Sequence, residues 1–153
     1  MSDPIRVSGI VSESIVDGPG LRFVLFVQGC EMNCPGCHNP ATHDKNGGFL
    51  MTADEIMEKI AANPLIDGVT FSGGEPFLQA EKLVPLAEKI KAAGLDLIVY
   101  SGYRYEELKT RPGAEKLLAL ADTLIDGQFI ESEKSLELRF MGSRNQRTIA
   151  LHP

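Results

Sequence analysis

The chain has three cysteines, Cys30, Cys34 and Cys37, and all of them lie within one short segment. An odd number of cysteines cannot form a closed set of disulfides, and a reducing cytosol keeps such thiols free in any case. Thiolates are soft ligands that suit iron-sulfur clusters and zinc. The grouping therefore predicts metal or redox chemistry at this segment.

The sequence offers no fourth cysteine ligand. Structural metal sites are usually closed by four protein ligands, whereas a catalytic metal keeps one position open. Three cysteines therefore indicate a cluster in which one iron remains available to a substrate.

Two other metal sites could use the same residues. The run from Cys34 to His38 matches the attachment pattern of c-type haem, but that attachment requires export, and residues 1–8 lack the basic and then apolar order of a signal peptide. A zinc site closed by His38 or His43, in a non-catalytic interaction module, is the main alternative that the residues leave open.

A thioredoxin-like redox pair at Cys34 and Cys37 is a third alternative. In such proteins the motif opens a helix, but Asn39 and Pro40 interrupt the chain here. This interpretation also leaves Cys30 without a role.

A buried strand must deliver the chain to Cys30. Residues 21–27 form a β-branched and aromatic run that is almost continuously apolar, which is typical of a strand covered on both faces. Open α/β sheets and barrels place their active sites beyond the carboxyl ends of such strands, so the position of the cysteines agrees with their chemistry. We expect further strands at residues 5–10, 68–71, 96–100 and 123–127.

Helices are expected between these strands. Thr52, with Glu55 three residues later, is a capping-box pattern that predicts the start of a helix reaching about Ala62. Strands that alternate with helices predict right-handed crossovers and a parallel sheet. The other helices are expected at residues 79–93, 105–109 and 113–120.

The length limits the fold. The 153 residues suit one domain, and no linker divides them, so we expect a single domain over residues 1–153. A closed eight-stranded barrel needs about 200 to 250 residues. We therefore expect an α/β fold with an open, partial barrel or a doubly wound sheet, and an irregular to weakly β tail over residues 135–153.

The composition narrows the class of protein. The net charge of −6 argues against a broad nucleic-acid surface, because neutralising phosphates needs clustered Lys and Arg. No apolar run approaches the roughly 18 residues that span a bilayer. We expect a soluble, cytoplasmic protein that binds neither nucleic acid nor membranes.

Two motifs in the chain resemble those of the radical S-adenosylmethionine superfamily: the three cysteines, and Ser72-Gly73-Gly74-Glu75-Pro76 downstream of them. The resemblance implies an open, partial parallel β/α barrel. Within the superfamily, further segments are similar to the activating proteins of anaerobic ribonucleoside-triphosphate reductase, and they cover nearly the whole chain. These segments run from Asp17 to Arg22, Cys34 to Cys37, Ser101 to Tyr103, Glu106 to Leu108, Leu124 to Phe129 and Gly142 to Gln146.

The resemblance also implies the cofactors and the reaction. A [4Fe-4S] cluster held by Cys30, Cys34 and Cys37 would have its fourth iron chelated by the amino and carboxylate groups of S-adenosylmethionine. One electron, from a flavodoxin-like donor, would break a sulfur–carbon bond to give methionine and a 5′-deoxyadenosyl radical. That radical would remove a hydrogen atom from a glycine of anaerobic ribonucleoside-triphosphate reductase, or of another glycyl-radical enzyme such as pyruvate formate-lyase.

Cofactor contacts are implied for Gly73, Gly74 and Glu75. Glycines let the backbone approach the methionine amino group closely, although a tight turn alone would also explain the pair. Glu75 would either accept a hydrogen bond from that amino group or cap the segment that follows it.

Further contacts are implied for Gly36 and His38, which flank Cys37 where related enzymes bring the backbone against adenine. The superfamily often has an aromatic residue at the position of Gly36, so this chain lacks that stacking side chain. Asp126, at the end of a predicted strand, would bind the ribose, a cation or the methionine carboxylate region, or be a solvated acid.

Two segments are candidates for partner contacts. Residues 17–20 and Arg22 resemble a segment of glycyl-radical activases and are expected to shape the mouth that admits the partner's glycine, although a turn explains the glycines equally well. The polar, basic run at residues 142–147 suits docking on an acidic partner or plain solvation.

Overall fold

A single mixed sheet organises the chain. The computed structural model describes residues 4–14, 20–29, 48–111, 113–126 and 147–151. Within them the seven strands are ordered β3-β1-β2-β4-β5-β6-β7. Their bounds are β1 Ile5–Ser14, β2 Arg22–Val27, β3 Phe49–Met51, β4 Gly68–Gly73, β5 Asp96–Tyr100, β6 Thr123–Asp126 and β7 Arg147–Ala150.

The expected parallel core is present as β2-β4-β5-β6. Each parallel strand lies beside the next one along the chain, as in a β/α barrel, and the sheet has two open edges at β3 and β7. The fold is therefore an open, partial barrel. Antiparallel strands extend it on both sides, which the alternation of strands and helices did not predict.

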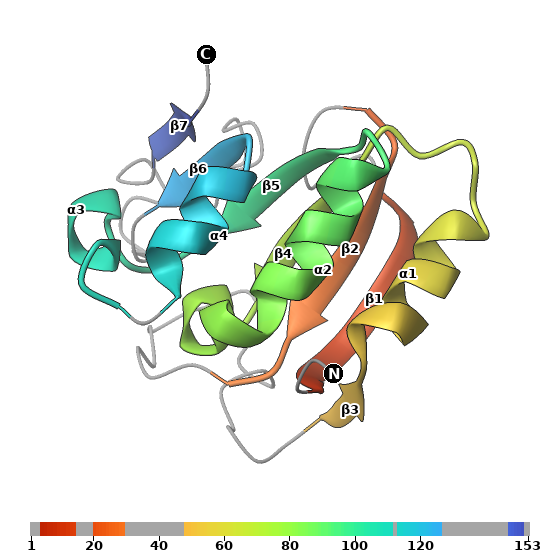
Figure 1. Cartoon of the computed structure of the whole chain (residues 1–153), viewed down its shortest axis with the longest axis horizontal. Helices are drawn as coiled ribbons and strands as arrows, with labels where there is room; N and C mark the ends of the chain where they lie inside the picture. Colours follow the sequence, from red (N-terminus) through yellow and green to blue (C-terminus); the bar gives the residue numbers. More distant parts are fainter. Residues whose placement is uncertain (1–3, 15–19, 30–47, 112, 127–146, 152–153) are drawn as a thin grey trace, which may run out of the picture.

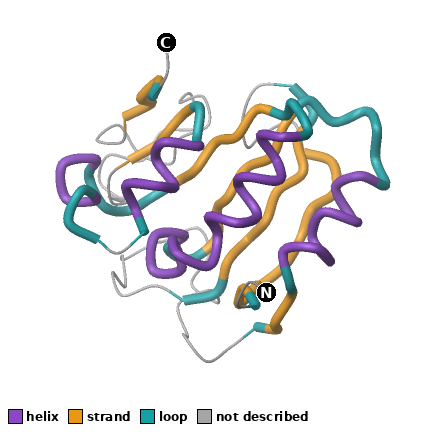
Figure 2. The backbone as a smooth tube through the Cα atoms, viewed as in Figure 1, coloured by secondary structure: helices purple, strands orange, loops and turns teal. Residues whose placement is uncertain are grey.

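The helices form a layer on one face of the sheet. Figures 1 and 2 show α1, α2 and α4 side by side in front of the strands. The capping box predicted at Thr52 is confirmed, because its hydroxyl accepts from the Glu55 N–H while the Glu55 carboxylate accepts from the Thr52 N–H. The helices are α1 Ala53–Ala61, η2 Pro76–Gln79, α2 Ala80–Ala92, α3 Tyr105–Leu108 and α4 Ala114–Leu120.

The core lies between the sheet and this helical layer. Alternate side chains of the parallel strands, such as Leu25, Phe71 and Val99, pack there with the apolar faces of the helices. The intervening residues Val24 and Ile98 are buried as well. The strands are thus covered on both faces, as their continuous apolar runs predicted.

Arg22 joins three strands at the amino-terminal edge of the parallel sheet. Its side chain is 1% exposed and donates from Nε to the Thr70 hydroxyl and from Nη2 to the Val69 carbonyl, each at 2.8 Å. It also forms an ion pair of 2.9 Å with Asp96, at the start of β5. This edge is opposite the one from which Cys30 continues, so Arg22 does not line a mouth there.

Three elements differ from the predictions. The strand β3 and the short helix η2 were missed, and β7 gives the last part of the chain more order than the expected tail. Residues 127–146 lie outside the described part of the chain. No helix among the described residues is long and apolar enough to cross a membrane.

We predict that Asp96→Asn lowers the free energy of unfolding by about 2 kcal/mol, because the buried Arg22 guanidinium then loses the Asp96 carboxylate as an ion-pair partner. Urea denaturation would measure the change. The matched control is Asp54→Asn, which removes an ion pair to Lys89 whose acid is 83% exposed. The control should change stability by less than about 0.5 kcal/mol, and equal losses would contradict a role for burial.

Candidate functional site

The carboxyl ends of the four parallel strands define the candidate site. Val27, Gly73, Tyr100 and Asp126 end β2, β4, β5 and β6, and these ends share one edge of the sheet because the strands are parallel. Two residues after Val27 the chain reaches Gly29, and Cys30 is next. The predicted residues Cys30, Cys34, Cys37, Gly36 and His38 lie outside the described part of the chain. The other predicted residues, Gly73, Gly74, Glu75 and Asp126, are described and lie at this edge.

The turn after β4 is bonded to the chain that enters the cysteine segment. The Gly74 N–H donates to the Val27 carbonyl at 2.9 Å, and the Glu75 N–H donates to the Gly29 carbonyl at 2.8 Å. The motif at residues 72–76 is therefore in direct backbone contact with the residues that lead into the cysteine segment.

Gly73 is required by the packing of β4 against β2. Its φ is +101°, and a Cβ on it would lie 2.5 Å from the Val27 nitrogen and 2.6 Å from the Val27 oxygen. Strand packing thus accounts for this glycine without any ligand, whatever its neighbour Gly74 contacts.

Glu75 joins the turn after β4 to the turn after β5. One carboxylate oxygen accepts from the Phe77 N–H at 3.1 Å and from the Ser101 hydroxyl at 2.8 Å, and the other accepts from the Gly102 N–H at 2.7 Å. The bond to Phe77 is the capping contact that the sequence offered as one option, at the start of η2.

Burial dominates the electrostatics of Glu75. The side chain is 1% exposed, and this loss of solvent raises its pKa to about 7, although the three hydrogen bonds and the charge of Arg111 act in the opposite direction. The guanidinium of Arg111 lies 4.3 Å from the centre of the Tyr103 ring. Sequence reasoning missed the roles of Ser101, Gly102 and Arg111, although it had singled out the segment from Ser101 to Tyr103, directly after a buried strand, as similar to the activating proteins.

Asp126 is fully buried at the end of β6. Its Oδ2 accepts from the Tyr105 N–H at 2.7 Å, which ties β6 to the first residue of α3. Asp126 therefore lies at the carboxyl edge, as expected. Its hydrogen bond to Tyr105 also holds the start of α3 in place.

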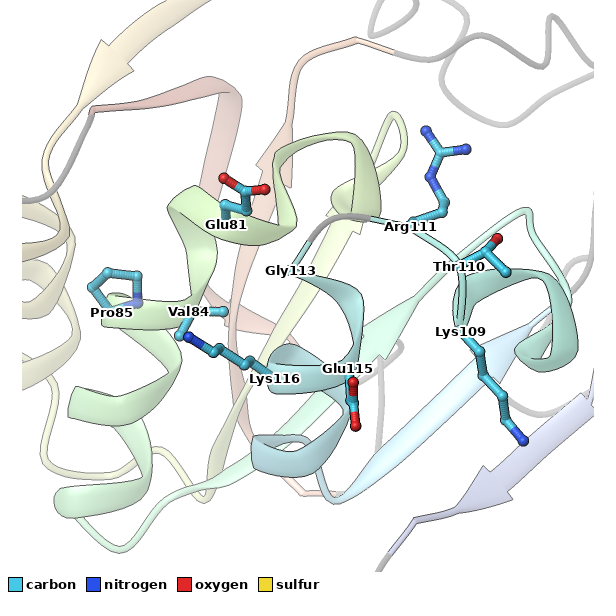
Figure 3. Close-up of a pocket in the computed structure, with 9 residues that line it drawn as sticks. All are labelled: Glu81, Val84, Pro85, Lys109, Thr110, Arg111, Gly113, Glu115 and Lys116. Atoms are coloured by element: carbon cyan, nitrogen blue, oxygen red, sulfur yellow. The ribbon is translucent and has the colours of Figure 1, made fainter.

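A cavity of about 550 Å³ lies between α2, α4 and the loop before α4. Figure 3 shows that its charged side chains diverge, with Lys109 and Arg111 pointing away from each other. Such a hollow offers no convergent polar groups and is not the candidate site. It is lined by Glu81, Val84, Pro85, Lys109, Thr110, Arg111, Gly113, Glu115 and Lys116.

Three thiolates suit an iron-sulfur cluster, and their segment starts at the edge where parallel strands end. Among the residues that the structure describes, no three His, Cys, Asp or Glu side chains are grouped to hold a metal ion. The described residues therefore offer no alternative metal site to the three cysteines.

Comparisons with known proteins agree with these features. Residues 16–149 match the family described as the 4Fe-4S single cluster domain. The chain is 36% identical over 142 residues to the anaerobic ribonucleoside-triphosphate reductase-activating protein of Haemophilus influenzae, and the match covers 86% of this chain and 89% of that protein. The corresponding protein of Escherichia coli K12 is also 36% identical over 142 residues and is covered to 90%.

Two other proteins match a smaller part. The pyruvate formate-lyase-activating enzyme of Clostridium pasteurianum is 42% identical over 112 residues, covering 67% of this chain and 47% of the enzyme, so the chain spans about half of that enzyme's length. The crystal structure of QueE from Escherichia coli has a TM-score of 0.50 at 18% identity, covering 67% of this chain and 53% of that one. This last likeness concerns the fold alone.

We predict that Glu75 makes stability fall as pH rises. Its raised pKa means that the unfolded chain ionises near pH 4.5 while the folded chain keeps the proton until about pH 7. The stabilising difference is complete below the unfolded pKa and is lost by about 3 kcal/mol as pH rises through that window. Urea unfolding of the wild type and of Glu75→Gln isolates this effect as the difference between their stabilities, and a difference that does not change between about pH 4.5 and pH 7 would contradict it.

Gly73→Ala should destabilise the protein by about 3 kcal/mol, because the new Cβ overlaps the Val27 backbone and the residue is held at a positive φ. Gly94→Ala is the matched control, since Gly94 also has a positive φ of +79° but nothing lies within 4 Å of its Cβ position. The control should lose only about 1 kcal/mol in urea unfolding. Equal losses of stability in the two variants would show that the close approach of β4 to β2 is not the reason for a glycine at position 73.

Proposed function

The chain belongs to the radical S-adenosylmethionine activating proteins with a single 4Fe-4S cluster domain, and we propose that its substrate is a glycyl-radical enzyme, an anaerobic ribonucleoside-triphosphate reductase. The observation that carries this choice is the match to the activating protein of Haemophilus influenzae, at 36% identity over 86% of this chain and 89% of that protein. The chain spans most of the activating proteins for that reductase but about half of an activating enzyme for pyruvate formate-lyase.

We propose that Cys30, Cys34 and Cys37 hold a [4Fe-4S] cluster, with one iron left for S-adenosylmethionine. When bound, such a cluster supplies the electron that splits S-adenosylmethionine into methionine and a 5′-deoxyadenosyl radical, and that radical takes a hydrogen atom from a glycine of the reductase, leaving 5′-deoxyadenosine and the glycyl radical. Three soft thiolates at the carboxyl edge of a parallel sheet support this assignment.

In this proposal the remaining residues of the site bind and orient S-adenosylmethionine. The Gly74 backbone contacts the methionine portion of that molecule, while Gly73 keeps the turn close to β2. Glu75 holds the turns after β4 and β5 together through its hydrogen bonds to Phe77, Ser101 and Gly102. Both turns would therefore keep a fixed position relative to the bound S-adenosylmethionine.

In the same proposal, Gly36 and His38 contact the adenine of S-adenosylmethionine, and Asp126 contacts its ribose. Asp126 already accepts from the Tyr105 N–H, so its contribution combines binding with the placement of α3. We also propose a flavodoxin-like protein as the electron donor and a cytoplasmic location.

A second candidate substrate is pyruvate formate-lyase, because the identity to one of its activating enzymes reaches 42%. The zinc-binding module that the residues left open has no support from the family match, which is to a 4Fe-4S domain.

The experiment that tests the proposal mixes the reduced, iron-loaded protein and S-adenosylmethionine with each candidate enzyme in turn. Electron paramagnetic resonance should detect a glycyl radical on the anaerobic ribonucleotide reductase. A radical only on pyruvate formate-lyase would transfer the assignment to the second candidate, and a radical on neither would refute the activase.

We predict that Cys34→Ala reduces 5′-deoxyadenosine formation to the background rate, because two thiolates cannot hold the cluster with a single open iron. Chromatography of the products after reduction measures the change, and iron content should fall in parallel. Turnover at the wild-type rate would show that Cys34 is not a ligand.

A further inference from the structure

Gln79 is a buried polar residue to which the proposed function gives no task. It is the last residue of η2 and is only 8% exposed. It also occupies the position before α2, but its side chain makes no capping bond to that helix. The side chain turns instead toward β1 and the end of β2.

The Gln79 amide makes three hydrogen bonds there. Its oxygen accepts from the Arg6 N–H at 2.8 Å, and its nitrogen donates to the Arg6 carbonyl at 2.9 Å and to the Gln28 carbonyl at 3.1 Å. The amide thus bonds both backbone groups of one residue of β1, as a neighbouring strand would. It extends the pairing of β1 one step beyond the end of β2.

The bond to Gln28 completes a series at the entry to the cysteine segment. The carbonyls of Val27, Gln28 and Gly29 are consecutive, and each accepts from the segment after β4: from the Gly74 N–H, from the Gln79 side chain and from the Glu75 N–H. All three peptide groups before Cys30 are therefore oriented by residues 74–79.

The other end of the cysteine segment returns to the same place. Gly48 is the first described residue after it, with a φ of +73°, and a Cβ there would overlap the Val7 carbonyl and lie 3.1 Å from Cβ of Gln28. Arg6, Val7 and Gln28 thus form a joint at which residues 30–47 leave and rejoin the sheet, and Gln79 bonds two of the three.

We propose that Gln79 is a positioning residue that fixes the backbone of residues 27–29, and so the direction in which the chain continues to Cys30. This inference rests on the proposed function, because it assumes that the cysteines hold the cluster. Without the amide, the Arg6 N–H and the Gln28 carbonyl each lose a hydrogen bond in a buried setting, and the peptide group between Gln28 and Gly29 is held less firmly.

The test compares the full chain with two variants and one control. Gln79→Met keeps the length of the side chain and removes all three bonds, whereas Gln79→Glu keeps an acceptor for the Arg6 N–H and removes the donor to both carbonyls. The control is Thr70→Val, which removes the buried acceptor of Arg22 Nε near the opposite edge of the sheet. It should lower the melting temperature to a similar degree, since a hydrogen bond to a buried charged group is lost.

The readouts are iron release to a chelator and the electron paramagnetic resonance line shape of the reduced cluster without S-adenosylmethionine. Residues that orient metal ligands typically change metal affinity by about tenfold to a hundredfold. We expect iron release from both Gln79 variants to be at least about tenfold faster, with a broadened signal, and release from Thr70→Val to match the wild type.

Two results would overturn the inference: wild-type iron release and line shape in either folded Gln79 variant, or an equal change in Thr70→Val, which would make the effect one of general stability. If Gln79→Met does not fold, Gln79→Glu decides by the same criteria. A wild type that holds no iron-sulfur cluster would refute the proposed function itself, which separates the two failures.

Discussion

The arrangement depends on one set of contacts, the three hydrogen bonds from residues 74–79 to the carbonyls of residues 27–29. They join the end of β2, from which the cysteine segment continues, to the glycine turn that follows β4. Because β2 and β4 are also paired along their whole length, the end of β2 and the turn after β4 have fixed neighbouring positions in one sheet.

Much of the fold could be predicted because its elements follow local rules. The apolar run before Cys30, the capping box at Thr52 and the strand at residues 96–100 each have a signal within a few residues, and each is present. The strand β3 has only three residues, too few for a period to be visible. The antiparallel pairing of β1 with β2 depends on the path of the connection between them, and no pattern within either strand encodes it.

The site was only partly predictable for a related reason. Residue types and spacing indicated the cysteines, whereas Gly73, Gly74 and Glu75 were indicated by the resemblance of their motif to a known family. The partners of Glu75, Ser101 and Gly102, are more than twenty residues away and meet it only because β4 and β5 are adjacent. Gln79 gave no signal, since a glutamine at the start of a helix is ordinarily solvated.

The two edges of the parallel sheet have different tasks. The Arg22 cluster joins β2, β4 and β5 at the amino end, and the glycine turn and cysteine segment belong to the carboxyl end. Substitutions at the amino end can therefore raise or lower the thermal stability of the protein while the contacts of the glycine turn stay unchanged. Evolution can therefore adjust stability at the amino edge of the sheet, several residues along each strand from the candidate site.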